Sequence, residues 1–540
     1  MMPTRRAFFV AILLLFPGLL PAQPALTDGL AGWSHPISSK NELAQRYFDQ
    51  GLTLAYAFNH AAAEASFREA ARLDPACAMC FWGAALVAGP NINAPMAEEA
   101  IASAWRDLEA ARALAASPAE RDYIAALARR YAEKPPADRA PLDLAYAEAM
   151  RELAAKYPDD ADAATLLAEA LMDLHPWDFW QASGEPQAWT GEILGMLEKV
   201  LGRWPDRPGA NHLYIHAVEA SRDPGRATAA ADRLRELVPA AGHLVHMPAH
   251  IYQRVGRYAD SAAANRRAIA ADVAAGSPGC HGTLYQLAYV PHNYHFLWAA
   301  LIQQGASQEA LTAAREMVAL VDPAAMREPG LGALQLYFSI PDLTRVRFGR
   351  WADLTSAKEP AADLPLARAI HHFARGLALV RSGELAAAET ENGKLAALAL
   401  DPLLEKITIW EINRADQLAN IAAQLLSGEI ALARLDSDKA LRHLERAVEL
   451  EDALRYDEPP TWPLASRHYL GAALLAAGRP AEAEAVYRQD LERQPDNGWS
   501  LFGLATSLER QEKKQAAQEV QTRLAKAFAA ADFEIAGSRF

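Results

Sequence analysis

The pattern of apolar and polar residues along this chain is that of paired helices. No segment alternates apolar and polar residues with the two-residue period of a half-buried strand, so a sheet is not expected. Small and large apolar residues instead return at fixed positions of a 34-residue unit. In the unit that begins at Ala44, positions 8, 20, 24, 27 and 32 hold Gly51, Ala63, Phe67, Ala70 and Pro75. Small residues at such positions let two helices cross closely, and large ones fill the space between units.

The same unit returns near the C-terminal end. Further copies begin at Ile421 and Leu464 and just before Trp499, with matching residues Gly428, Ala440, Leu444, Ala447, Gly471, Gly478, Ala483, Tyr487, Pro495, Phe502 and Gly503. This pattern resembles the tetratricopeptide repeat (TPR), a helix-turn-helix unit that stacks into a solenoid. The resemblance implies an all-α fold, an α-solenoid of TPR-like repeats.

Departures from the repeat divide the chain into segments. The central part is more divergent but keeps register, since Pro205 and Pro239 lie 34 residues apart. The first expected segment, 40–160, holds N-terminal TPR-like repeats with an irregular helical insert that begins with a loop at 89–93. Histidine-rich central repeats are expected at 161–320, and C-terminal TPR repeats at 321–540.

Residues 1–25 resemble an export signal peptide. Arg5 and Arg6 give a positive start, an apolar run covers 7–20, and Ala22 and Ala25 are small residues suited to cleavage. The paired arginines also resemble a twin-arginine signal, which exports folded proteins, whereas the strongly apolar run favours an ordinary secretory signal. Both alternatives predict a periplasmic or secreted protein.

Charge and hydropathy narrow the range of partners. The chain has 53 basic and 67 acidic residues and a formal net charge of −14, which argues against nucleic acid or an anionic membrane as the main partner. The N-terminal apolar run is too short for a transmembrane helix, and no later stretch is long enough. We therefore expect no transmembrane segment after signal removal.

Cysteine is rare, with three residues in the chain. Cys77 and Cys80 form a C-x-x-C motif in a helical stretch, and Cys280 stands alone. In an oxidising compartment the first two could form a disulfide, although the i,i+3 geometry of a helix is strained for one. Two buried thiols are the alternative. A thioredoxin-like site would need a βαβ context, which is absent.

Eight of the 15 histidines lie between residues 212 and 295, and seven of them are closely grouped. These seven form three groups: His212 and His216; His243, His246 and His250; His292 and His295. The spacings of three, four and seven residues put the imidazoles of each group on one face of a helix. Imidazole is the commonest protein ligand for zinc, copper and iron. The pattern therefore predicts a transition-metal site.

The repeat frame places these groups on neighbouring units. With units beginning at Pro208, Gly242 and Pro291, the histidines and Glu219 fall at positions 2, 5, 9 and 12 of the first helix. In tetratricopeptide families these positions line the concave groove, so the resemblance implies that all face one groove. The predicted metal ligands are His212, His216, Glu219, His243, His246, His250, His292 and His295. A groove that hydrogen-bonds a peptide, or a packing or pH-sensing cluster, is the alternative.

Other residues are expected near this groove. Asp162 and Glu169 register on the preceding unit so as to face it. His175, Trp177 and Trp180 follow in a proline-containing segment, and such aromatic residues commonly line small-molecule pockets.

The ligand types favour particular metals. An all-nitrogen set with few carboxylates suits copper or zinc better than calcium, magnesium or a carboxylate-rich iron centre. A pair of copper ions, each held by about three histidines, is the leading hypothesis. Iron stays open because Glu219 beside two histidines could form a two-histidine-one-carboxylate triad.

The mature chain also resembles bacterial exported TPR proteins through the blocks Phe58-Asn59-His60, 89–93 and 246–252. That resemblance implies a fold and no settled activity. One hypothesis is an exported metalloprotein, an oxidoreductase if a coordination position is open to a small substrate. The alternative is a non-enzymatic periplasmic scaffold with a peptide or protein partner in its groove, and metal storage or delivery lies between them. No nucleophile triad, phosphate-binding loop or zincin motif supports a hydrolase or a kinase.

Overall fold

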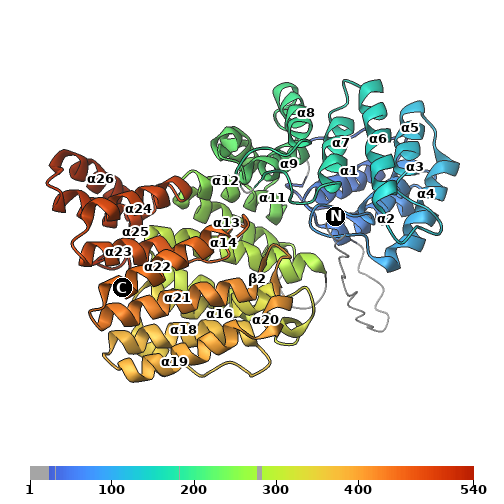
Figure 1. Cartoon of the computed structure of the whole chain (residues 1–540). Helices are drawn as coiled ribbons and strands as arrows, with labels where there is room; N and C mark the ends of the chain where they lie inside the picture. Colours follow the sequence, from blue (N-terminus) through green and yellow to red (C-terminus); the bar gives the residue numbers. More distant parts are fainter. Residues whose placement is uncertain (1–23, 31, 182, 277–282) are drawn as a thin grey trace. The chain divides into compact units, whose positions relative to one another are not determined.

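The computed structural model describes residues 24–30, 32–181, 183–276 and 283–540, so the predicted export signal lies almost wholly outside it. The described elements are nearly all α-helices (Figure 1). The strands among them are β1 (Thr408–Ile409) and β2 (Asn413–Arg414), which pair in one short antiparallel hairpin. None of the described helices has both the length and the apolar character needed to cross a bilayer.

The chain forms two compact units. The N-terminal unit comprises the described residues 24–251 and 267–276, and the C-terminal unit comprises 252–266 and 283–540. The division falls inside the segment 161–320 that the sequence groups as histidine-rich repeats.

The helices of the N-terminal unit are α1 (Glu42–Tyr56), α2 (His60–Leu73), α3 (Ala78–Val87), α4 (Ile101–Leu114), α5 (Pro118–Leu127), α6 (Ala140–Lys156), α7 (Ala161–Asp173), α8 (Thr190–Arg203), α9 (Pro208–Glu219), α10 (Thr228–Leu237) and α11 (Gly242–His246). Each of them packs on the next, and α1 with α3, α3 with α5 and α7 with α9 pack across one intervening helix. The helix α1 also contacts α9, although the two are far apart in the sequence. Two further helices, α12 (Pro248–Arg254) and α13 (Tyr258–Ala274), contain residues of both units.

The helices of the C-terminal unit are α14 (Val290–Gln304), α15 (Ser307–Ala319), α16 (Ala333–Arg347), α17 (Trp351–Thr355), α18 (Pro365–Arg381), α19 (Leu385–Ala399), α20 (Pro402–Lys406), α21 (Ala415–Ala433), α22 (Ser437–Asp452), α23 (Ser466–Ala476), α24 (Pro480–Arg493), α25 (Gly498–Arg510) and α26 (Lys514–Ala527). They pack in the same way, with α14 on α16, α21 on α23 and α23 on α25 across one helix, except that the short α20 packs on α18 and α21 and that α19 packs on α21. Packing on the next helix and the next but one is typical of stacked helical repeats. The fold is an all-α solenoid of TPR-like repeats, as the sequence predicts.

Small residues of the repeat face large ones across each helix pair. A Cβ atom at Gly51 would lie 2.7 Å from the ring of Phe67, and one at Gly428 would lie 2.7 Å from Leu444. Both pairs join position 8 of the first helix to position 24 of the second. The predicted reason for glycine at position 8, close helix crossing, is thereby confirmed.

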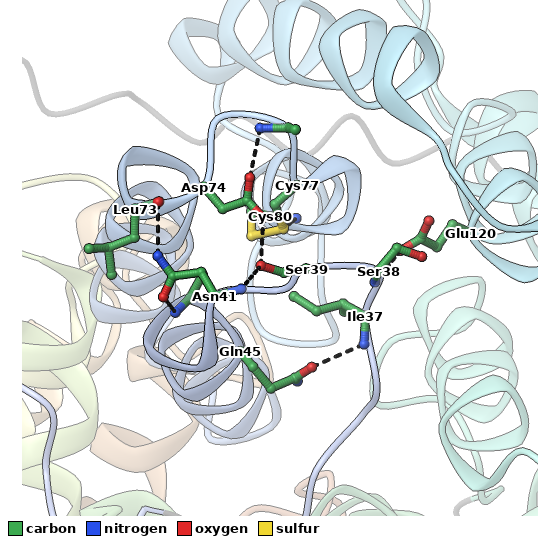
Figure 2. Close-up of a disulfide and its surroundings, with 12 residues drawn as sticks. Ile37, Ser38, Ser39, Asn41, Gln45, Leu73, Asp74, Cys77, Cys80 and Glu120 are labelled. Carbon is green, nitrogen blue, oxygen red and sulfur yellow. Dashed lines mark hydrogen bonds between the residues drawn. A yellow bond between two sulfur atoms is a disulfide. The ribbon is translucent and has the colours of Figure 1, made fainter.

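A disulfide joins Cys77 and Cys80 at the start of α3 (Figure 2). Cys77 is the N-cap residue, with φ −73° and ψ 97°, so the bond does not span two helical positions. For this reason the strain expected for a helical i,i+3 pair does not apply. Beside the disulfide, Ser39 donates a 2.6 Å hydrogen bond to Asp74 and ties the segment before α1 to the loop before α3 (Figure 2).

Candidate metal centre

The helix α9 carries His212, His216 and Glu219 on one side. It begins at Pro208, where a missing N–H is harmless because the first helical N–H groups have no partner within the helix. The i,i+4 spacing then stacks the two imidazoles one turn apart, with ring centroids 4.8 Å from each other. Every residue of α9 is buried, so this face points into the protein.

His243, His246 and His250 come from two short helices and not from the single helix that the spacing suggests. The helix α11 ends at His246 and α12 begins at Pro248. Proline cannot continue the hydrogen-bond ladder of the preceding turn, so the direction changes there. His243 nevertheless meets α9, since its Nε2 lies 3.2 Å from Nε2 of His212.

Three imidazoles form the geometric centre of the site. One ring nitrogen each from His212, His216 and His243 lies within 4.8 Å of the others. The three residues are 0%, 3% and 3% exposed. We call this group the histidine trio. Three ring nitrogens that converge in a buried place could hold a metal ion.

The outer nitrogens of two trio members are held by the protein. Nδ1 of His212 lies 2.6 Å from the backbone carbonyl of Tyr56, at the end of α1. Nδ1 of His216 lies 2.7 Å from Oε1 of Glu219. Since both partners accept, each Nδ1 donates its N–H and the lone pair is left on Nε2. Nε2 of His216 is buried and has no hydrogen-bond partner.

Glu219 holds a second imidazole as well. Its Oε2 accepts a short hydrogen bond from Nδ1 of His250, and Nε2 of His250 lies 3.0 Å from Nε2 of His246. Burial alone would raise the pKa of Glu219, but His250 and His216 together lower it below its usual range. An ionised Glu219 therefore directs two imidazoles, with both oxygens engaged.

Burial sets the charge state of the trio. It lowers the pKa of His212 and of His243 well below the ordinary value, and the neighbouring imidazoles lower both further. Burial also lowers the pKa of His216, against the opposing effect of Glu219. All three rings are therefore neutral at pH 7, the state in which imidazole binds metal.

His292 and His295 belong to α14 of the C-terminal unit. His292 is half-buried, with its ring centroid 4.8 Å from that of Phe296. His295 is buried against Trp298 and Tyr337, at centroid distances of 5.6 and 5.0 Å. Burial lowers the pKa of His295 to about 3. That these two residues share a metal site with the other five stays a prediction.

Two aromatic residues border the histidine trio. The ring centroid of Phe58 lies 4.6, 6.0 and 5.6 Å from those of His212, His216 and His243. Trp177 meets His216 edge-on at 5.1 Å. Trp177 belongs to the proline-containing segment whose aromatic residues are expected near the groove. Phe58 lies in the sequence block 58–60, and nothing around it in the sequence indicates a contact with His212 or His243.

Asp162 lies in a separate polar cluster of the N-terminal unit. It accepts from Nδ1 of His35 at 3.0 Å and from the hydroxyl of Tyr56 at 3.1 Å. Asp160 caps α7 and accepts from Tyr123 at 2.7 Å. His35, Tyr123, Asp160 and Asp162 line a pocket of about 530 Å³. Because their oxygens are used internally, the cluster anchors the segment before α1 onto α7.

Glu169, which the repeat frame also assigns to the groove, lies on α7 close to Asp173 and Arg130. Burial and the charge of Asp173 raise the pKa of Glu169 to about 8, so it is largely protonated at pH 7. Arg130 donates to Asp173 at 2.5 Å and to the carbonyl of Pro90 at 3.0 Å. This group therefore holds the loop at 89–93 in place.

Comparisons with known proteins add little. No protein-family model matches the chain, and no curated protein matches it. Among solved structures it is similar to the human IFIT1 dimer with m7Gppp-AAAA, at 11% identity over 92% of both chains and a TM-score of 0.32. It is likewise similar to a monomeric IFIT1 mutant with Gppp-AAAA, at 11% identity over 91% of both chains and a TM-score of 0.33. A likeness at this level says nothing about a ligand or partner of the present chain.

Proposed function

We propose that this chain is an exported metalloprotein that binds a transition-metal ion, copper by preference, at His212, His216 and His243. The observation that carries the proposal is the buried Nε2 of His216, which has no hydrogen-bond partner and lies in a group of three converging ring nitrogens. A buried polar atom without a partner costs free energy. A metal ion at the centre of the trio would remove that cost.

The donor set supports copper over harder cations. The trio offers nitrogen alone, and copper(II) is the strongest binder of such ligands among the divalent first-row metals. Zinc accepts the same ligands, whereas calcium and magnesium require oxygen. A copper ion would supply one-electron redox chemistry at this position.

The protein's own part is to orient the donors and exclude water. Tyr56 and Glu219 fix which nitrogen of His212 and of His216 faces inward. Such outer hydrogen bonds raise the basicity of an imidazole and set its direction. We assign Glu219 to this orienting role, and not to direct ligation, because both of its oxygens accept imidazole N–H groups.

A second ion is part of the proposal. Nε2 of His246 and Nε2 of His250 face each other at 3.0 Å, and the Glu219 bond leaves the lone pair of His250 on Nε2. This pair lies next to the trio, with the rings of His243 and His246 at a centroid distance of 5.8 Å.

Export is supported by the N-terminal sequence and by the disulfide at Cys77 and Cys80. Disulfides persist in oxidising compartments such as the periplasm and are rare in the cytosol. The peptide-scaffold alternative is less well supported, because imidazoles that are 0–3% exposed offer little surface to a peptide.

The test is elemental analysis of the purified full chain, followed by titration with copper(II) and zinc(II). We expect about one to two equivalents of retained or titrated metal per chain. The double variant His212→Ala, His243→Ala should lose most of it, and His443→Ala, which changes a histidine on α22, should not. Circular dichroism would confirm that each variant is folded. A folded native chain that binds no more metal than the double variant would refute the proposal.

A further inference from the structure

Phe58 covers the histidine trio from one side. Its ring centroid lies 4.6, 6.0 and 5.6 Å from those of His212, His216 and His243, and the residue is 5% exposed. Its φ is +54°, in the left-handed region that non-glycine residues seldom adopt. Such a conformation persists only where the surroundings impose it.

The turn between α1 and α2 imposes this conformation. The N–H of Phe58 donates to Ala55 at 2.9 Å, and the N–H of Asn59 donates to Leu54 at 3.0 Å. The side chain of Asn59 then caps α2. With the backbone fixed on both sides, the ring of Phe58 is aimed at the trio.

Trp177 covers a second side and is also in the left-handed region, with φ +58°. Its indole N–H donates to Oδ1 of Asn93 at 3.1 Å, and the N–H of Asn93 donates to Oδ1 of Asn91 at 2.8 Å. Trp177 is half-buried, so part of it faces solvent while its ring meets that of the buried His216.

The two covers are joined through one chain of contacts. Asn91 donates to Nδ1 of His60 at 3.5 Å, and the ring of His60 contacts that of Phe58 edge-on. Phe58 and Trp177 therefore each place an aromatic ring against the trio, and contacts through His60, Asn91 and Asn93 link the two residues.

We propose that Phe58 and Trp177 select the molecules that reach a metal at the trio, and admit small uncharged molecules such as dioxygen, nitric oxide or carbon monoxide while excluding anions. This inference rests on the proposed metal binding. An anion would have to lose its hydration beside aromatic rings that offer it no hydrogen bond, and desolvating a charge is costly. A diatomic neutral molecule carries no such penalty.

The test uses the copper-loaded full chain with two probes. Carbon monoxide binding to the reduced form is measured by infrared spectroscopy. Azide binding to the oxidised form is measured by its charge-transfer absorption. We expect the native chain to bind carbon monoxide and to bind azide weakly. Trp177→Ala should bind azide at least about tenfold more tightly with carbon monoxide binding little changed, a difference of about 1.4 kcal/mol.

Trp189→Ala serves as the control. It removes a tryptophan of the same segment that stacks on His175 at a centroid distance of 3.6 Å and donates to the carbonyl of Asp178, so azide should stay excluded. Phe58→Leu is the conservative variant of a selecting residue: it keeps an apolar side chain beside the trio, so the exclusion of azide should persist. Equal azide affinity in the native chain and in Trp177→Ala, at equal copper content, would overturn the selection and leave metal binding intact. Absence of copper from the loaded native chain would overturn both proposals.

Discussion

His216 and Glu219 lie one turn apart on α9 and share a 2.7 Å hydrogen bond from Nδ1 to Oε1. The bond fixes the tautomer of the imidazole, with the proton on Nδ1. The lone pair that can bind a metal ion is therefore on Nε2, which has no hydrogen-bond partner. Since the other oxygen of the carboxylate accepts from His250, one side chain orients rings from two helices. A metal site that depends on this bond should respond to its removal.

Glu219→Gln should weaken metal binding by about 10- to 100-fold. The amide oxygen can accept from one imidazole, but the amide nitrogen cannot accept from the other, so one ring loses its orientation. Competition against a chelator of known affinity would measure the change. Glu192→Gln, which removes an exposed carboxylate paired with Arg151 on the surface, should leave the affinity unchanged. An unaltered affinity in Glu219→Gln would show that the carboxylate does not orient the ligands.

Gly209→Ala should reduce both stability and metal affinity. An added Cβ would lie 2.6 Å from the ring of Tyr56, and Tyr56 must then move with the carbonyl that holds His212. Overpacking of this kind destabilises by about 1–3 kcal/mol, which urea denaturation would detect. Gly191→Ala on α8, where nothing lies within 4 Å, is the matched control. If the two variants behave alike, the contact with Tyr56 does not support the site.

Thiol titration should distinguish the disulfide from free cysteines. Of the three cysteines, Cys77 and Cys80 are joined, so unfolded but unreduced protein from an oxidising compartment should show one thiol per chain and reduced protein three. Replacing both with serine should lower the free energy of unfolding by about 2 kcal/mol, the loop-closure value for so short a separation. Three thiols before reduction would contradict the bond.

Acid should destabilise the chain through His295. Burial lowers its folded-state pKa to about 3, while the unfolded-state value is about 6.5. Between these values the unfolded chain takes up a proton that the folded chain does not, so stability falls as the pH drops from 6.5 toward 3 and levels off below. At pH 5 the loss relative to pH 7 is about 2 kcal/mol. In metal-free protein, we expect the native chain to lose about 2 kcal/mol more free energy of unfolding between pH 7 and pH 5 than His295→Asn loses. Denaturant titration at both pH values would measure the difference. An identical loss in both proteins would place His295 in contact with water.

The fold was predictable because the repeat acts through local pairs. Gly51 and Phe67 are 16 residues apart, so one unit of sequence contains both partners of the helix crossing. The hairpin at 408–414 was not predicted, since strands of two residues are too short to show alternation. The histidine spacing predicts one helix over 243–250, whereas the structure has a break between His246 and Pro248, because the proline cannot continue the hydrogen-bond ladder.

The sequence predicts which imidazoles share a helix face in the candidate site, but not which residues contact them. The i,i+4 spacing alone puts His212 and His216 on one face of α9. The partners of those rings are set by long-range packing, as with Tyr56, which lies 156 residues from His212. The role of Glu219 depends on His250, 31 residues away, and no spacing rule distinguishes an orienting carboxylate from a ligand.

Tyr56 has a consequence for the biosynthesis of the protein. Its carbonyl meets His212 and its hydroxyl meets Asp162, so residues from α1, α7 and α9 must all be in place before the first imidazole is oriented. No nascent fragment that ends before α11 holds the complete trio. On the proposed function, a metal ion can therefore be loaded only into the finished unit. Loading before export would require a route that carries folded protein, and loading after export would take the metal from the destination compartment.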